Sequence, residues 1–362
     1  MSFGARALIR LGALRHNLQV IRKQAPGARV MAVIKGNAYG HGMVEVAQAL
    51  SAVDSLAVAR LCEAQALREA GIDTPVVILE GALETDQLDA AVGSGFEIVV
   101  HSDEQLEMLE QLDAGRLTVW LKFDTGMNRL GFGVSDADAI IARARACRAV
   151  GDLRLMSHLA NADDRQDPTT AEQLRRFRSV ADGFDGDVSI ANSPAIFAWP
   201  DSIFDSAGDN WIRPGITLYG ISPFEENSGK DLGLCPVMQF ESRLIAVKAI
   251  RAGERVGYGG TWEATEDSII GIIAAGYGDG YSRFMPSGTP VLVNERRVPL
   301  AGRVSMDMIA VELGADASDK VGDPALLWGD GLPVEEVARH AATIAYQLVC
   351  GVTHREPSVF VD

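Results

Sequence analysis

Residues 30–42 have the sequence VMAVIKGNAYGHG, in which the pattern of a buried strand is followed by a lysine that can take part in chemistry. The apolar run 30–34 is typical of a strand that is covered on both faces. It ends in Lys35, which a polar, glycine-rich loop follows. In a parallel β/α barrel the C-terminal strand ends form the active-site face. A lysine at the rim of such a pocket has a lowered pKa, and its amine can then form a Schiff base.

Seven further β-branched runs alternate with helix-like segments before residue 220. They are residues 55–60, 75–79, 97–100, 117–123, 153–158, 188–191 and 212–219. Two helix starts fit the S/T-x-x-E/Q capping box, at 102–105 and 170–173. Eight strands separated by helices predict an eight-stranded TIM-type β/α barrel. The rival fold, a doubly wound sheet, requires a G-x-G-x-x-G turn, and Gly36, Gly40 and Gly42 do not follow that order.

The sequence changes character after residue 219. Residues 222–236 are rich in Pro, Gly, Ser and charge, and we interpret them as a linker. One late helix is expected at 334–347. The other segments favour strands and turns, with candidate strands at 242–250, 268–274, 290–293 and 306–313. We therefore expect a barrel domain over residues 1–232 and a mostly β domain over residues 233–362.

Composition excludes several classes of partner. The 362 residues carry a net charge of −16, which argues against nucleic acid or an anionic membrane as the principal partner. No apolar run has the length of a membrane span. Residues 1–44 hold seven basic and no acidic residues, but they run directly into the first strand, so we interpret them as part of the fold and not as a transit peptide. The four cysteines are far apart, which predicts buried, reduced thiols in the cytoplasm and no metal site.

Eight motifs, in this order along the chain, resemble those of the alanine racemase family, which is pyridoxal-phosphate-dependent and of fold type III. They are KGNAYGHG at 35–42, KFDTGMNRLG at 122–131, SHLA at 157–160, NS at 192–193, RPGITLYG at 213–220, GYG at 257–259, GYGDG at 276–280 and GRVSMD at 302–307. Each motif is weak alone, and together they are specific. The resemblance covers nearly the whole chain and implies a β/α barrel followed by a β domain.

The resemblance implies that two residues exchange the α-proton of alanine, one on each face of the substrate. Lys35 would hold pyridoxal phosphate as a Schiff base and act as one acid/base group, and Tyr258 would be the other. Because an ordinary tyrosine has a pKa of about 10, it needs neighbours that stabilise its phenolate. The family pattern supplies a histidine and an arginine, which correspond to His158 and Arg213.

The same resemblance assigns the cofactor contacts. Arg213 would face the pyridine nitrogen, and because arginine does not readily give up a proton, the cofactor becomes a weaker electron sink and racemisation is favoured over transamination. Tyr39, Ser193, Gly215 and Ile216 would bind the phosphate through hydroxyl and backbone N–H groups.

Substrate contacts are also implied by the resemblance. Arg129 and the backbone of Met306 would meet the carboxylate of alanine, with Tyr277 near the entrance. In many family members the lysine that corresponds to Lys122 is carbamylated and holds the arginine in place, and we predict the carbamate here. The alternative is an unmodified Lys122 paired with Asp124.

The family resemblance further implies a homodimer with shared active sites, because the acid/base tyrosine comes from the partner subunit. Gly36 departs from the alanine that is common there, which is expected to loosen the loop, and His354 stands where some members place a tyrosine. Two other activities stay open on sequence grounds. They are a racemase of broader specificity, for serine or larger side chains, and a non-catalytic pyridoxal-phosphate carrier, although carriers and the fold's decarboxylases do not match the motifs around Tyr258 and Met306.

Overall fold

A computed structural model describes residues 3–112, 115–353, 355 and 357–362. The chain divides into two compact units, each taken here by itself. One unit contains Leu18–Ala38 and Met43–Leu218, and the other contains the chain up to Asn17, Tyr39–Gly42 and the chain from Tyr219 onward. The expected boundary at 232/233 stays a prediction. No helix in the described ranges is long and apolar enough to cross a membrane.

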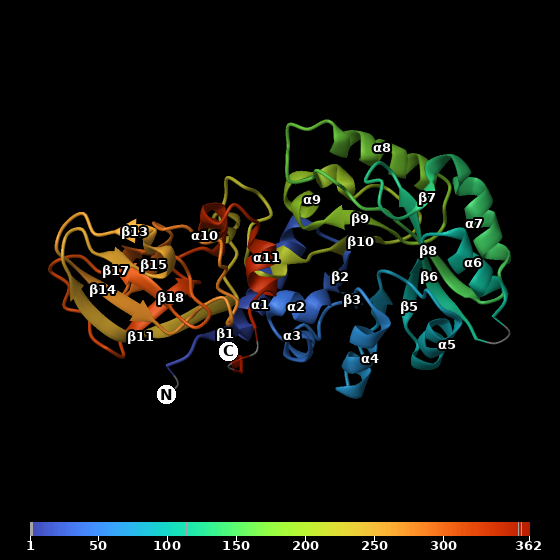
Figure 1. Cartoon of the computed structure of the whole chain (residues 1–362). Coiled ribbons are helices and arrows are strands. Elements are labelled where there is room, and N and C mark those ends of the chain that lie inside the picture. Colours follow the sequence, from blue (N-terminus) through green and yellow to red (C-terminus); the bar gives the residue numbers. More distant parts are fainter. Residues whose placement is uncertain (1–2, 113–114, 354, 356) are drawn as a thin grey trace. The chain divides into compact units, whose positions relative to one another are not determined.

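The first unit is a closed barrel of eight parallel strands (Figure 1). Around the ring they are β2 (Arg29–Val33), β3 (Ser55–Val58), β4 (Val76–Ile78), β5 (Glu97–Val100), β6 (Leu117–Asp124), β8 (Val150–Met156), β9 (Val188–Asn192) and β10 (Asn210–Arg213). The pairings of β5 with β6 and of β10 with β2 close the ring. Seven of the eight predicted strands are confirmed. The strand predicted at 212–219 is wrong in its bounds, because it lies at Asn210–Arg213 and Ile216–Tyr219 form a 3-10 helix. Most residues of these strands are buried, as a strand covered on both faces requires, whereas Gly151 and Asp152 of β8 are exposed.

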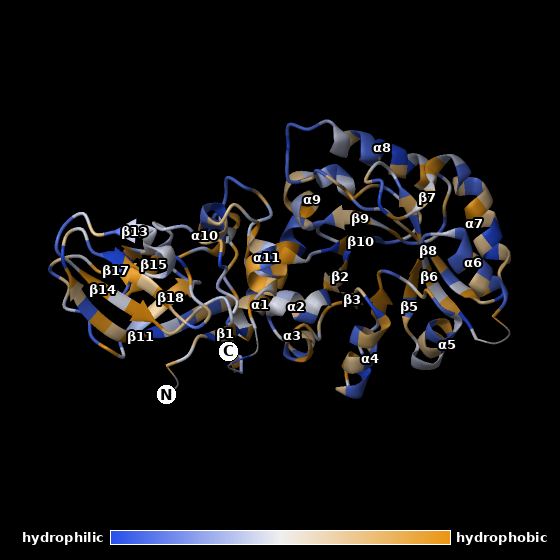
Figure 2. Ribbon diagram, viewed as in Figure 1, coloured by the Kyte–Doolittle hydropathy of each residue, from blue (hydrophilic) through white to orange (hydrophobic). Residues whose placement is uncertain are grey.

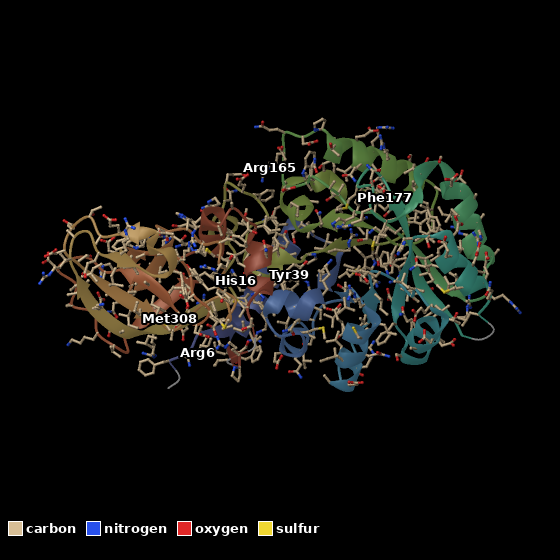
Figure 3. The ribbon with its side chains drawn as sticks, in the orientation of Figure 1. Arg6, His16, Tyr39, Arg165, Phe177 and Met308 are labelled. Carbon is tan, nitrogen blue, oxygen red and sulfur yellow. The ribbon has the colours of Figure 1, made fainter. Side chains whose placement is uncertain are left out.

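Helices connect the strands of the barrel. They are α2 (Lys35–Gly40), α3 (Met43–Ala49), α4 (Leu61–Glu69), α5 (Thr85–Ser94), α6 (Asp103–Glu110), α7 (Ala137–Ala146), α8 (Thr169–Ala181) and α9 (Ser193–Ala198), with α1 (Leu11–Gln24) before them. Short elements are β7 (Phe132–Gly133), η1 (Val134–Asp136), η2 (Pro200–Ser202) and η3 (Ile216–Tyr219). Helix α8 turns Phe177 toward the strands (Figure 3), while its other face is mostly hydrophilic (Figure 2).

The two expected capping boxes have different outcomes. Ser102 is the N-cap of α6 and accepts a hydrogen bond from the backbone N of Gln105. The box at Thr170 is wrong, because Pro168 occupies the N-cap position and the helix begins at Thr169. Gln173 is therefore not a capping residue, and its side chain is used elsewhere.

A polar and aromatic network fills part of the barrel interior. The Arg154 guanidinium lies 5.3 Å from the ring centroid of Trp120 and 5.2 Å from that of Trp211. It pairs with Glu97 at 3.1 Å and Asp187 at 3.3 Å, and these carboxylates accept hydrogen bonds from the two indole N–H groups. Burial raises the pKa of Glu97 although the adjacent Arg154 opposes that shift. Desolvation thus outweighs the ion pair, as is common for buried pairs.

The second unit is mostly β. Its strands are β1 (Arg6–Arg10), β11 (Met238–Ile250), β12 (Arg255–Val256), β13 (Trp262–Glu263), β14 (Ser268–Ile273), β15 (Pro290–Val293), β16 (Arg296–Pro299), β17 (Ile309–Glu312), β18 (Pro324–Trp328) and β19 (Val359–Val361). Its helical elements are η4 (Gly229–Leu232), η5 (Tyr258–Gly260), α10 (Val334–His340) and α11 (Ala345–Cys350). The long strand β11 pairs with β1, β14 and β18, so it organises the sheet.

One expectation for this unit is wrong in detail. The single late helix is two, because Ala342 has a left-handed φ of 50° and Ile344 is extended. The proposed linker is ordered, since the buried carboxylate of Glu335 accepts hydrogen bonds from the backbone N of Ser222 and Gly229. The cysteines are all free thiols, but only Cys147 is buried.

Candidate active site

Lys35 lies directly after the barrel strand β2 and begins an unusual turn. From Gly36 to Gly40 every residue has a positive φ, so α2 has a left-handed backbone conformation, which costs ordinary L-residues about 1–2 kcal/mol each. Two hydrogen bonds hold the turn. The backbone N of Gly36 donates to Glu63 Oε1 at 2.7 Å, and the backbone N of Met43 donates to Asn37 Oδ1 at 2.9 Å. The lysine is thus presented by a strained but fixed backbone.

Four cationic side chains surround His158 at the C-terminal ends of the barrel strands. They are Lys35, Lys122, Arg129 and Arg213, all of which act electrostatically on His158. Burial, followed by the charges of Arg213, Arg129 and Lys35, lowers the pKa of Lys122 to about 8. The structure thus brings together five residues that the sequence assigned to one site.

Asp124 does not neutralise Lys122 by an ion pair. Among the described residues, no carboxylate oxygen lies within ion-pair distance of the Lys122 amine, although Asp124 acts weakly on its pKa. Asp124 Oδ1 instead accepts hydrogen bonds from the backbone N of Gly126 and Asn128. This closes the loop that carries Arg129. Gly131 has a φ of 135°, and a Cβ at this position would lie 2.6 Å from the backbone N of Asp124, so only glycine fits.

Arg213 is buried and holds the His158 ring. Its Nη2 lies 3.3 Å from His158 Nδ1, and its other contacts are the Ser157 carbonyl oxygen and the Ser189 hydroxyl. Burial lowers the pKa of Arg213 to about 10, so it remains charged at neutral pH. Burial and the nearby cations lower the pKa of His158 well below its usual value, so its ring is neutral.

This contact fixes the tautomer of His158. Arginine has only donors, so His158 Nδ1 must accept, and the ring proton must be on Nε2. The positive charge of the pair therefore resides on Arg213, while His158 presents a neutral N–H donor. The family resemblance had predicted that His158 and Arg213 act together, but it had not indicated which of them carries the positive charge.

Ser193 and Gly215 form a small cluster of hydrogen-bond donors. The backbone N of Gly215 lies 2.9 Å from Ser193 Oγ, and Thr217 Oγ1 lies 3.1 Å from the same atom. Ser193, Thr217 and Ile216 are all buried. Thr217 was not singled out from the sequence, although its position in the motif at 213–220 could have indicated it.

The remaining predicted residues belong to the second unit. Tyr39 (Figure 3) packs against Tyr219 and Tyr346, with ring centroids 5.0 and 6.0 Å away, and burial raises the pKa of its hydroxyl, so the group stays protonated. Tyr277 and Met306 lie on neighbouring segments, since the backbone N of Tyr277 donates to the Ser305 carbonyl oxygen and the backbone N of Gly278 donates to the Met306 carbonyl oxygen. Their side chains are exposed.

Tyr258 lies in η5 of the same unit, and its side chain is 66% exposed. Since the two units are described separately, the placement of Tyr258 beside Lys35 stays a prediction. His354 lies outside the described residues.

Comparison with known proteins identifies the family. Residues 9–223 match the family model "Alanine racemase, N-terminal domain", and residues 237–360 match "Alanine racemase, C-terminal domain". The chain is 50% identical to an alanine racemase of Aliivibrio salmonicida over 353 residues, or 97% of each chain. It is 48% identical to a biosynthetic alanine racemase of Escherichia coli over 99% of each chain. The crystal structure of the biosynthetic alanine racemase from Pseudomonas aeruginosa superposes with a TM-score of 0.94 at 42% identity over all of both chains. The chain belongs to the alanine racemase family.

Proposed function

We propose that Lys35 and Tyr258 are the two acid/base groups with which this chain interconverts L- and D-alanine. The observation that carries the assignment is the contact of neutral His158 with charged Arg213 inside a cluster of cations. A neutral Nε2–H can donate to a tyrosine oxygen, and Arg213 behind it favours the phenolate that a base requires.

The described residues fit pyridoxal phosphate as the cofactor. Ser193, Thr217 and the backbone N of Gly215 are close together, and all of these groups can donate hydrogen bonds to a phosphate. We assign Tyr39 and the backbone of Ile216 to the same phosphate, with Tyr39 as a neutral donor because burial raises its pKa. When bound, the cofactor withdraws electrons from the substrate Cα and so weakens its C–H bond.

The chain's own residues then carry the proton. Lys35 takes or returns it on one face of the substrate, and Tyr258 does so on the other. Arg213 keeps the pyridine side of the site cationic, which limits electron withdrawal and so favours return of the proton to Cα. Arg129, the backbone of Met306 and Tyr277 are assigned to the carboxylate and the entrance.

We further propose that each active site is completed by Tyr258 of the partner subunit in a homodimer. Several large apolar side chains of the second unit are exposed in the single chain, among them Tyr258, Phe284 at 84% and Met306 at 53%. Such a surface is typical of an interface. The chain is expected to act in the cytoplasm and to supply D-alanine for peptidoglycan or L-alanine for catabolism. Its similarity to relatives that are named biosynthetic favours the first role.

Subunit mixing tests this arrangement. Lys35→Ala and Tyr258→Phe homodimers should each be inactive. After dissociation and random reassociation, half of the dimers are hybrids with one native site, so about a quarter of wild-type activity should return. Mixing Lys35→Ala with His158→Asn is the control. Both residues lie in the same barrel, so each site of the hybrid keeps one of the two defects and no activity should return. If no mixture regains activity although hybrids form, the shared site is refuted.

Substrate range is tested by deuterium exchange. The enzyme is incubated in D₂O with a panel of L- and D-amino acids, and incorporation at Cα is followed by mass spectrometry. Alanine should exchange fastest in both forms. No exchange from alanine would refute the racemase assignment, and equal exchange from serine would establish broader specificity.

A further inference from the structure

The side chain of Gln173 in α8 lies beside the segment that carries His158. Gln173 is 1% exposed, and both ends of its amide are used. Its Oε1 accepts from the backbone N of Ala160 at 2.9 Å, and its Nε2 donates to the His158 carbonyl oxygen at 3.0 Å and to Thr125 Oγ1 at 3.3 Å. Thr125 in turn shares a 2.8 Å hydrogen bond with the hydroxyl of Ser157.

The same segment is held from a second direction. Arg213 donates to the Ser157 carbonyl oxygen and to His158 Nδ1, and the backbone N of Ser157 donates to the Ser189 carbonyl oxygen at 3.0 Å. Arg213 thus contacts the ring, while Gln173 holds the main chain at the His158 carbonyl oxygen and the Ala160 N–H, on the C-terminal side of the ring. Because the ring contact is 3.3 Å long, a small shift of the His158 backbone is enough to break it.

We propose that Gln173 is a positioning residue for the reaction, which keeps His158 where Arg213 can fix its Nε2–H tautomer. The inference rests on the proposed role of His158. Removing the amide leaves the His158 carbonyl oxygen and the Ala160 N–H without their partners, so the segment relaxes toward other donors. The ring then loses its orientation, although no group that touches the substrate has changed.

The chain offers a matched control in Gln105 of α6. Gln105 is also buried, its Oε1 accepts from the backbone N of His101 at 2.8 Å, and its Nε2 donates to the carbonyl oxygens of Glu80 and Ala82. It makes the same kind of contact at another strand end, where no residue is assigned a role in the reaction. Its loss should cost stability alone.

The test compares Gln173→Met with Gln105→Met in the full-length enzyme loaded with pyridoxal phosphate. We expect similar losses of thermal stability in both variants. Only Gln173→Met should lower kcat, by roughly tenfold or more, with KM changed by less than about threefold, and only this variant should shift the pH profile of kcat. Equal effects of the two variants on kcat, with unchanged pH profiles, would overturn the proposal.

The variant Gln173→Glu tests whether the lost hydrogen bond, and with it the activity, can be restored. A protonated glutamic acid has one donor and one acceptor, so it can restore the contact with the His158 carbonyl oxygen, whereas a carboxylate cannot. Its kcat relative to wild type should therefore rise as pH falls. A ratio that does not depend on pH would count against the proposal.

A spectroscopic readout does not depend on turnover. The chain has six histidines, so ¹⁵N-histidine labelling allows the His158 ring signals to be identified by their loss in His158→Asn. The Nε2–H tautomer should persist in Gln105→Met and be lost or divided in Gln173→Met. If His158→Asn retains full activity, the proposed role of His158 fails. If it is inactive and Gln173→Met keeps the tautomer, the present inference alone fails.

Discussion

We predict that Lys122 of the wild-type enzyme carries a carbamate, and replacing Lys122 with arginine should abolish it. Arginine keeps the positive charge but has no amine that adds to carbon dioxide. In wild type the uncharged amine forms an N–C bond to CO₂ and releases a proton, so an ammonium cation becomes a carbamate anion. The surroundings favour this change, since Arg213, Arg129 and Lys35 all repel a charged Lys122.

The magnitude follows from the pKa of Lys122. With a pKa of about 8, about a quarter of Lys122 is uncharged at pH 7.5. An ordinary lysine with a pKa near 10.4 is uncharged in only about 0.1% of molecules at that pH. The reactive form is therefore roughly 200-fold more abundant at Lys122 than at a surface lysine. Because the folded-state pKa is lowered, the uncharged fraction of Lys122 rises as pH rises through about 8 and becomes small under acidic conditions.

The assay is ¹³C NMR of the enzyme in buffer that contains ¹³C-bicarbonate, recorded between pH 6 and 9. Wild type should give one slowly exchanging carbamate signal that weakens below neutral pH, and Lys122→Arg should lack it. Lys248→Arg is the control, because Lys248 is an exposed lysine in β11. Absence of the signal from wild type at pH 8.5, or its survival in Lys122→Arg, would refute the reasoning, as would a high-resolution map with a bare amine at Lys122.

Two further substitutions test the backbone and the barrel interior. Gly36→Ala should lower the free energy of unfolding by about 1–2 kcal/mol, because φ is +63° and no neighbouring atom lies within 4 Å of the added Cβ. Gly93→Ala, at an equally open but right-handed position in α5, should instead stabilise, by about 0.5–1 kcal/mol. Urea titration of both variants measures the difference, and a stable Gly36→Ala would contradict the strain. Arg154→Met should cost about 3–5 kcal/mol at pH 7 by leaving the partly buried carboxylate of Glu97 without its cation. This cost should shrink as pH falls, since the pKa of Glu97 is raised and its neutral form needs no partner, and a deficit that grows in acid would be inconsistent with this account.

The barrel could be predicted because its signals are local. Strands of a parallel barrel are mostly buried on both faces and tend to appear in the sequence as apolar runs, so seven of the eight were identified. The last was predicted too far along the chain, because the apolar residues Ile216–Tyr219 form a 3-10 helix. Strand β1 (Arg6–Arg10) was missed because its partners, β11 and β19, are more than two hundred residues away in the chain. The late helix was misread for a local reason. The stretch 334–347 has helical spacing, but the left-handed Ala342 and the β-branched residues after it end the first helix.

Prediction of the site was limited in the same way, because contacts between residues far apart in the chain cannot be read from the sequence. Motifs located Lys35, Lys122, His158 and Arg213, and the structure places the four within electrostatic range of one another. Gln173 was interpreted as part of a capping box, because its distant partners cannot be read from neighbouring residues. The same holds for the charge of His158, which depends on burial and on cations from other strands.

The charge distribution connects composition to chemistry. The chain has a net charge of −16, yet Lys35, Lys122, Arg129 and Arg213 gather around one histidine, and the nearby Asp124 is engaged by backbone N–H groups. A cluster of cations is costly on its own, because like charges repel and each charge is partly desolvated. The proposed phosphate, substrate carboxylate and Lys122 carbamate would each bring negative charge to these cations. We therefore interpret the cluster as a preorganised site for these proposed anions.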